Sequence, residues 1–170
     1  MPENVTIRRE LPQDIEAISR VTEAAFRLHP HSQQTEQFIV DELRRCGALS
    51  VSLVAELDRQ VVGHIAFSPV EISDGSPNWY ALGPVSVAPE HQRRGIGQAL
   101  VETGLAALRS LGAEGCVLVG EPAFYQRFGF RSLPQCTMDG VPQEVVLLLA
   151  LGKRVATGKV THHPAFSAKG

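Results

Sequence analysis

The stretch Val87–Leu100, VAPEHQRRGIGQAL, combines residue types that could bind a phosphorylated ligand. A β-rich run leads into a basic turn with two glycines, and an apolar helical pattern follows at once. Gly95 and Gly97 have no Cβ atoms, so the backbone can bend there and a phosphate can approach its N–H groups. The start of a helix carries about half a positive charge, and Arg93 and Arg94 add charge-assisted hydrogen bonds. The pattern therefore predicts a pyrophosphate-binding loop.

Two other phosphate-binding patterns do not fit this stretch. A dinucleotide-binding motif requires a third glycine near position 100, where Leu100 stands, and an acidic residue after the next strand. A P-loop requires Gly-Lys-Ser/Thr, which does not follow the glycines here. The remaining alternative is an ordinary turn between a strand and a helix, with a solvent-exposed pair of arginines.

The apolar periodicity predicts the elements that must position this loop. Strands are expected at residues 5–9, 49–57, 60–68, 79–87, 116–119, 130–133 and 145–149. Helices are expected at residues 12–27, 35–45 and 97–111, with a short one at 122–128. The connection from strand 79–87 to strand 116–119 should be a right-handed parallel crossover. The fold class is therefore α+β, a mixed α/β sheet flanked by about four helices.

Length and composition predict one domain with a substantial core, since the chain has 170 residues and 44% of them are apolar. Residues 1–151 should form this domain. Residues 152–170 turn polar and rich in Gly and Lys, so we expect a C-terminal tail packed loosely on the domain or extending from it. A net charge of -2 gives no electrostatic reason to expect nucleic acid or an anionic membrane as a partner.

Several features favour a cytoplasmic location. The longest apolar run, Val145–Leu151, falls well short of the roughly 20 residues that a membrane-spanning helix needs. The N-terminus lacks the basic start and apolar core of a signal peptide. The three cysteines are widely spaced and show no metal-ligand pattern, which is typical of reduced thiols.

Three stretches together resemble the GNAT superfamily of acetyl-CoA-dependent N-acetyltransferases. Gln92-Arg-Arg-Gly-Ile-Gly97 fits the Gln/Arg-x-x-Gly-x-Gly/Ala signature of the family's pyrophosphate loop, and Gly120–Phe130 resembles its second cofactor motif. The closing His163-Pro-Ala-Phe166 resembles the tail of the bacterial YhbS-like branch. The element order agrees over residues 5–149. The resemblance implies a sheet of six to seven strands, splayed between the fourth and the fifth.

The resemblance also implies how a co-substrate, acetyl-CoA, would bind, with no metal. Pantetheine would insert beside the central strand and pair with backbone groups of Val85 and Val87, while the pyrophosphate would lie on the loop. The implied binding residues are Val85, Ser86, Val87, Gln92, Arg93, Arg94, Gly95, Ile96, Gly97, Gln98 and Tyr125. The backbone N–H of Val87, or of a neighbour at the splay, would polarise the thioester carbonyl.

Catalysis in such a protein needs a proton for the departing thiolate and a base for the amine. The resemblance assigns Tyr125 as the general acid, because a phenol is protonated at neutral pH. Many relatives carry a glutamate at the position of Gly83, so a direct carboxylate base is missing here. Glu71, Glu121 and His64 remain as candidates, acting directly or through water, unless the substrate is a weakly basic amine.

The implied function is an N-acetyltransferase that moves an acetyl group to a primary amine by direct attack in a ternary complex. The acceptor could be a small molecule or a protein, and the chain a monomer or a homodimer. A covalent acyl-cysteine route is disfavoured, because Cys116 lies within an apolar strand where a thiolate is unstable. The alternative is an acyl-CoA-binding sensor module with little or no turnover.

Overall fold

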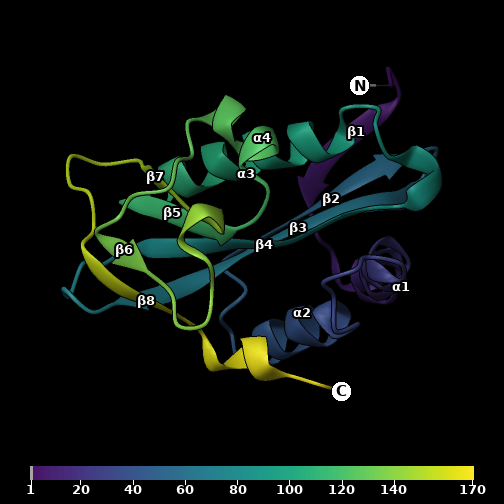
Figure 1. Ribbon diagram of the computed structural model, residues 1–170. Coiled ribbons are helices and arrows are strands. Elements are labelled where there is room, and N and C mark those ends of the chain that lie inside the picture. Colours follow the sequence, from purple (N-terminus) through teal and green to yellow (C-terminus); the bar gives the residue numbers. More distant parts are fainter. Residues whose placement is uncertain (1) are drawn as a thin grey trace.

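A mixed β-sheet organises the chain in the computed structural model, which describes residues 2–170 (Figure 1). The strands are β1 (Val5–Arg9), β2 (Val51–Leu57), β3 (Gln60–Ile72), β4 (Trp79–Val87), β5 (Gly115–Val119), β6 (Cys136–Thr137), β7 (Val146–Ala150) and β8 (Gly158–His162). Their order along the main path is β1-β2-β3-β4-β5-β7, and β8 pairs with both β3 and β6. The expected mixed α/β fold is confirmed.

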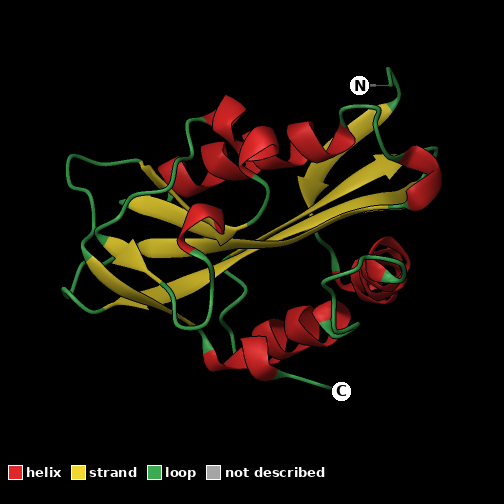
Figure 2. Cartoon of the chain, viewed as in Figure 1, coloured by secondary structure: helices red, strands yellow, loops and turns green. Residues whose placement is uncertain are grey.

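Helices cover both faces of the sheet (Figure 2). The helices are α1 (Ile15–Phe26), α2 (Glu36–Arg45), α3 (Ile96–Ser110) and α4 (Pro122–Tyr125). Figure 1 shows α3 and α4 on one face and α1 and α2 on the other. Within residues 2–170, none of these helices is long and apolar enough to cross a membrane.

Helix α3 is held close to the sheet by its apolar side and by one glycine. Leu100 and Leu108, two turns apart, are both fully buried. Gly104 lies between them, and a Cβ atom there would overlap the ring of Phe67 on β3. The helix ends at Ser110, and Gly112 just beyond it adopts the left-handed conformation at φ 79° that a C-terminal glycine cap requires. This packing fixes the start of α3 relative to β4.

The crossover from β4 through α3 to β5 is parallel, as the sequence predicts. Its ladder is short, with Trp79 opposite Gly115 and Ala81 opposite Val117 as its outer pairs. Beyond Ala81 the two strands diverge, while β5 continues its pairing with β7 up to Val119. The expected splay between the fourth and fifth strands is therefore confirmed.

Three expectations about single elements are wrong. Residues 130–133 form no strand, because Arg131 makes only an isolated bridge to Leu148. Strand β3 continues to Ile72, beyond the expected end at residue 68, so Glu71 lies within a strand. Strand β8 was not expected at all. Its partners lie at residues 70–72 and 136–137, far away in the sequence, so no local pattern indicates the pairing.

The C-terminal segment is tied to the domain more firmly than its polar composition suggests. Ala156 and Val160 are buried in a small apolar cluster that also contains Trp79 of β4. Ala165, just past β8, is buried against Leu43 of α2. Whether residues 1–151 alone fold as the domain stays a prediction.

Candidate cofactor and catalytic site

The glycine-rich loop between β4 and α3 has an unusual backbone. After Val87 the chain makes a short 3₁₀ turn at Pro89–His91 and then enters α3 at Ile96. Arg93 and Gly95 both have positive φ values, 64° and 83°. Conformations with positive φ turn successive N–H groups toward one side and form concave anion sites. The loop therefore has the backbone shape that an anion-binding helix start requires.

A cavity of about 470 Å³ opens at this helix start. Its lining residues are Val87, His91, Gln92, Arg93, Gly95, Ile96, Gly97, Gln98, Phe124 and Arg127. Two of them are arginines and none is acidic, so the cavity favours an anion. A Cβ atom at Gly97 would meet nothing closer than Val87 Cγ2, at 3.8 Å. The space above this glycine is therefore open to a bound group.

The cavity gathers seven of the eleven residues expected to bind the cofactor, and they are Val87, Gln92, Arg93, Gly95, Ile96, Gly97 and Gln98. Arg94 is exposed and does not line it. The side-chain amide of Gln92 donates to the carbonyl of Val87 at 3.0 Å, so this residue braces the end of β4. Ile96 is buried and anchors the first turn of α3 in the core.

Three lining residues, His91, Phe124 and Arg127, were missed by the sequence analysis. The Arg127 guanidinium donates to Gln98 Oε1 at 3.1 Å and lies 4.9 Å from the centroid of the Phe124 ring. These contacts hold the cation beside the start of α3. Phe124 and Arg127 are three residues apart on a helical stretch, and residues at this spacing share one face. This spacing was the available signal that the two side chains lie together. Nothing local indicated that this face would meet α3.

The backbone of β4 is open on one edge next to the cavity. The backbone N–H of Ala88 donates to Val62 O of β3 at 2.8 Å, so the N–H group of this residue points toward β3. Backbone direction alternates along an antiparallel strand. The N–H groups of Val85 and Val87 therefore point to the other side, where no strand of the described residues pairs with β4 beyond Ala81. The side chain of Ser86 lies buried between them.

A bulge marks the place where β4 leaves β5. Ile65 of β3 lies opposite Val85 and Phe67 lies opposite Leu82, so two residues of β4 lie opposite the single residue Ala66 and β4 has one extra residue. The two residues are Gly83 and Pro84, joined by a cis peptide bond. No carboxylate stands at this point of the strand. Past the bulge, the edge of β4 that faces away from β3 has no strand partner among the described residues, so a ligand could pair with it as a further strand.

Tyr125 lies on α4, just past the end of β5, and is 9% exposed. Its ring packs edge-on against Phe124, with the centroids 4.9 Å apart, and also contacts Phe130. Burial, together with the nearby Cys116 thiol, raises the pKa of Tyr125 to about 12. The phenol is therefore a proton donor throughout the neutral range. A Cβ atom at Gly120 would lie 2.7 Å from Tyr125 Cε2, so this glycine makes room for the ring.

The other candidate acid–base groups have different surroundings. Glu121 caps α4 by accepting a hydrogen bond from Ala123 N, and Glu71 is exposed on β3. His64 is fully buried on β3. Burial raises the pKa of the Cys116 thiol, which disfavours the thiolate that an acyl-cysteine route would need. Among residues 2–170, no group of three or more potential ligands could hold a metal ion.

Comparisons with known proteins agree with this architecture. The model of the acetyltransferase (GNAT) family matches residues 15–130. A protein of Escherichia coli (strain K12) with the name uncharacterized N-acetyltransferase YhbS is 35% identical over 125 residues, which cover 73% of this chain and 72% of that protein.

Two solved structures cover nearly the whole chain. A GNAT family acetyltransferase from Brucella melitensis in complex with acetyl-CoA is 48% identical, with a TM-score of 0.87 over 98% of this chain and 100% of that one. YhbS from Escherichia coli in complex with CoA is 29% identical, with a TM-score of 0.89 over 100% of this chain and 96% of that one.

Proposed function

The chain belongs to the acetyltransferase (GNAT) family, and from this premise we propose that it transfers the acetyl group of acetyl-CoA to a primary amine. The amine would attack the thioester directly while both substrates are bound. The observation that carries the proposal is the open backbone edge of Val85 and Val87, which leads straight into the anion-binding cavity at the start of α3. A pantetheine chain and its diphosphate need these two features side by side.

The described residues fit acetyl-CoA. The N–H groups of the loop and the cations Arg93 and Arg127 would hold the diphosphate. The N–H groups of Val85 and Val87 would pair with the pantetheine amides, as in a β-ladder. The related structures with acetyl-CoA and CoA support the same ligand for this chain.

Acetyl-CoA supplies an activated acyl group, so the protein needs mainly to position and polarise it. The N–H of Val87, or of a neighbour near the bulge, would donate to the thioester carbonyl as negative charge develops there. Tyr125 would donate its phenolic proton to the departing sulfur. The buried Cys116 takes no part, which favours direct attack over an acyl-enzyme.

Replacing Gly120 with alanine tests the placement of Tyr125. The added methyl group would lie 2.7 Å from Cε2 of the Tyr125 ring, which is too close, so we expect the ring to move. We expect a lower kcat with little change in the dissociation constant for acetyl-CoA, since Gly120 does not line the cavity. Steady-state kinetics and calorimetry measure the two effects. A normal kcat in the folded variant would show that the ring position does not matter.

An acceptor screen tests the proposed function itself. The chain is incubated with acetyl-CoA and a broad panel of small amines, amino acids and peptides, and the released thiol is detected. We expect calorimetric binding of acetyl-CoA together with thiol release for one chemical class of amine. Binding without release for any amine would instead support the sensor module, and an absence of binding would contradict both.

A further inference from the structure

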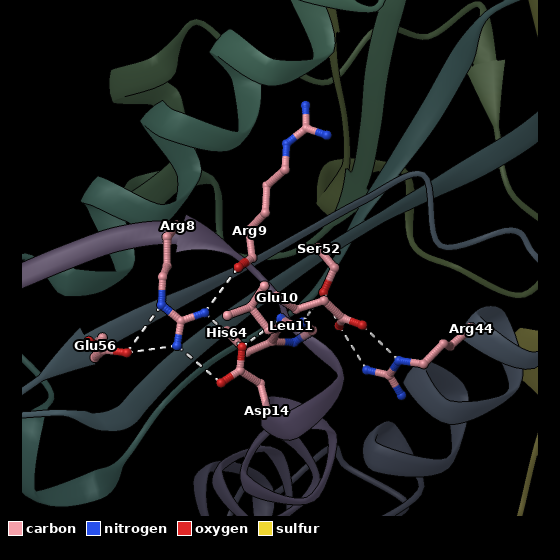
Figure 3. Close-up of polar contacts among 9 residues, drawn as sticks. All are labelled: Arg8, Arg9, Glu10, Leu11, Asp14, Arg44, Ser52, Glu56 and His64. Carbon is pink, nitrogen blue, oxygen red and sulfur yellow. Dashed lines mark hydrogen bonds and ion pairs between the residues drawn. The ribbon is translucent and has the colours of Figure 1, made fainter.

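A row of polar side chains, partly buried at one end and fully buried at the other, lies on the face of the sheet that carries α1 and α2 (Figure 3). Arg44 of α2 donates two hydrogen bonds to the carboxylate of Glu10, at 2.9 and 2.8 Å. The hydroxyl of Ser52 lies 2.5 Å from Glu10 Oε1 and 2.8 Å from His64 Nε2. Residues from β2, β3, α2 and the end of β1 are thereby joined into one row.

The acceptors and donors of this row fix where each proton lies. Burial acts to raise the pKa of Glu10, but hydrogen bonds from Arg44 and Ser52 outweigh it and lower the pKa, so the carboxylate is ionised. An ionised carboxylate only accepts, so the Ser52 hydroxyl must donate to it. The same oxygen is then free to accept the Nε2 proton of His64. The structure thus assigns His64 as the Nε2–H tautomer, with a lone pair on Nδ1.

His64 Nδ1 is buried and has no hydrogen-bond partner among the described residues. Burial lowers the pKa of His64 to about 4. The charge of Glu10 acts to raise this pKa and the charge of Arg44 acts to lower it, and the ring is neutral at pH 7. An unpartnered buried acceptor is costly, because it has lost its hydrogen bonds to water and gained none in the protein. Such a group invites a functional explanation.

Ser86 is the group best placed to meet this lone pair. It lies directly opposite His64 in the β3–β4 ladder, so both side chains share one face and their Cβ atoms lie about 5 Å apart. Its hydroxyl is also buried and unpartnered within residues 2–170, so the two groups do not hydrogen-bond to each other in this structure, and a rotation of the Ser86 side chain must close the link. Ser86 stands between Val85 and Val87, and one residue pair separates it from the bulge at Gly83. The row therefore reaches the strand that would hold the thioester.

The outer end of the row reaches solvent. Glu10, Arg44 and Ser52 line a second cavity of about 290 Å³ at the end of β1. The side chain of Glu10 is 18% exposed there. A proton that arrives at the carboxylate can therefore leave to water without crossing the core.

We propose that Ser86, His64, Ser52 and Glu10 form a proton relay that removes the surplus proton of the acceptor amine. This inference rests on the proposed function. An alkylamine of pKa about 10 arrives protonated, and the bulge at Gly83 offers no carboxylate to deprotonate it. The relay supplies the missing route, with His64 as a positioning residue that acts through Ser86.

Each transfer in the relay is balanced. Ser86 Oγ takes a proton from the ammonium group, directly or through one water, and passes its own proton to His64 Nδ1. His64 releases its Nε2 proton to Ser52 Oγ, whose own proton moves to Glu10. Glu10 then loses that proton to water in the outer cavity and restores its ion pair with Arg44. These transfers leave His64 protonated on Nδ1, so the ring must return to the Nε2–H tautomer, by proton exchange with water, before the next turnover. Because a buried imidazolium is unstable, the ring passes the charge on and does not store it.

The ring assignment is tested without any substrate. Nitrogen-15 NMR of the histidine rings in the free protein reports which nitrogen carries the proton. We expect His64 to be neutral and protonated on Nε2 at pH 7. In Ser52→Ala the Nε2 proton loses its acceptor, so the ring signals should change, whereas those of Thr22→Val should not. A charged ring, or one protonated on Nδ1, would overturn the relay.

Kinetics of Ser52→Ala test the relay in turnover. We expect kcat to fall by about 10²-fold, with the KM for acetyl-CoA unchanged, because Ser52 lies away from the cofactor cavity. Ser52→Thr keeps a hydroxyl and should restore the rate. Thr22→Val is the matched control, since this buried hydroxyl bonds only to Ile18 O of its own helix at 2.7 Å.

The possible failures can be told apart. An active wild-type chain whose Ser52→Ala variant is equally fast overturns the relay and leaves the proposed function intact. A wild-type chain that binds acetyl-CoA but acetylates no amine overturns the proposed function, and the relay with it. A loss of rate in both Ser52→Ala and Ser52→Thr would indicate a packing role for Ser52 and would also overturn the relay.

Discussion

Replacing Gly97 with aspartate is expected to weaken acetyl-CoA binding by about 10²-fold or more, while the chain stays folded. Gly97 lines the cavity at the start of α3, and its backbone suits any L-residue with open space above it. A carboxylate there would face the diphosphate, and one unit charge at 4 Å contributes about 4 kcal/mol at an effective dielectric constant of 20. In the free protein the same carboxylate should stabilise the first turn of α3. Calorimetry and thermal unfolding measure the two effects.

Gly97→Asn is the matched control, because asparagine has nearly the shape of aspartate but no charge. We expect it to retain much more affinity than Gly97→Asp. Equal losses in the two variants would mean that the effect is steric. An aspartate variant that binds acetyl-CoA as tightly as the parent would contradict a diphosphate site at this helix start.

Replacing Tyr125 with phenylalanine is expected to lower kcat by about 10²-fold or more, the usual contribution of a positioned general acid. The substitution removes only the hydroxyl and keeps the edge-on packing against Phe124. Since Tyr125 does not line the cavity at the start of α3, acetyl-CoA should bind with nearly normal affinity. Single-turnover and steady-state measurements of thiol release provide the test.

Tyr80→Phe is the control for this substitution, because Tyr80 is the only other tyrosine of the chain. Its hydroxyl has no role in the proposed chemistry, so thiol release should be unchanged. An unchanged rate in Tyr125→Phe as well would remove this phenol from the mechanism. The proton for the departing sulfur would then have to come from water.

The family and the core of the fold could be predicted because their signals are local. The loop at residues 92–97 connects a strand directly to a helix. The residues that suit it to binding an anion are consecutive in the chain, so they can be recognised without knowing the rest of the fold. The family match and the β4–α3–β5 crossover confirm both inferences. Strand β8 was missed for the opposite reason, since its polar sequence becomes a strand only against partners that are distant in the chain.

For Tyr125, the sequence motif and the tertiary packing each explain a different part of the residue's expected role. The second cofactor motif indicated the residue, and its place among the aromatic rings of α4 then explains why the phenol stays protonated. Arg127 and Phe124 belong to the same stretch, but only the packing of that stretch against α3 places them at the cavity.

By itself, the sequence predicted the order of elements from β1 to α4, a loop suited to binding an anion, and the family, because each depends on residues adjacent in the chain. Only the tertiary structure decided that the edge of β4 is open, and that residues 10, 52, 64 and 86 form one row. Sheet register is the physical reason. It joins side chains from separate strands at spacings that no sequence period encodes.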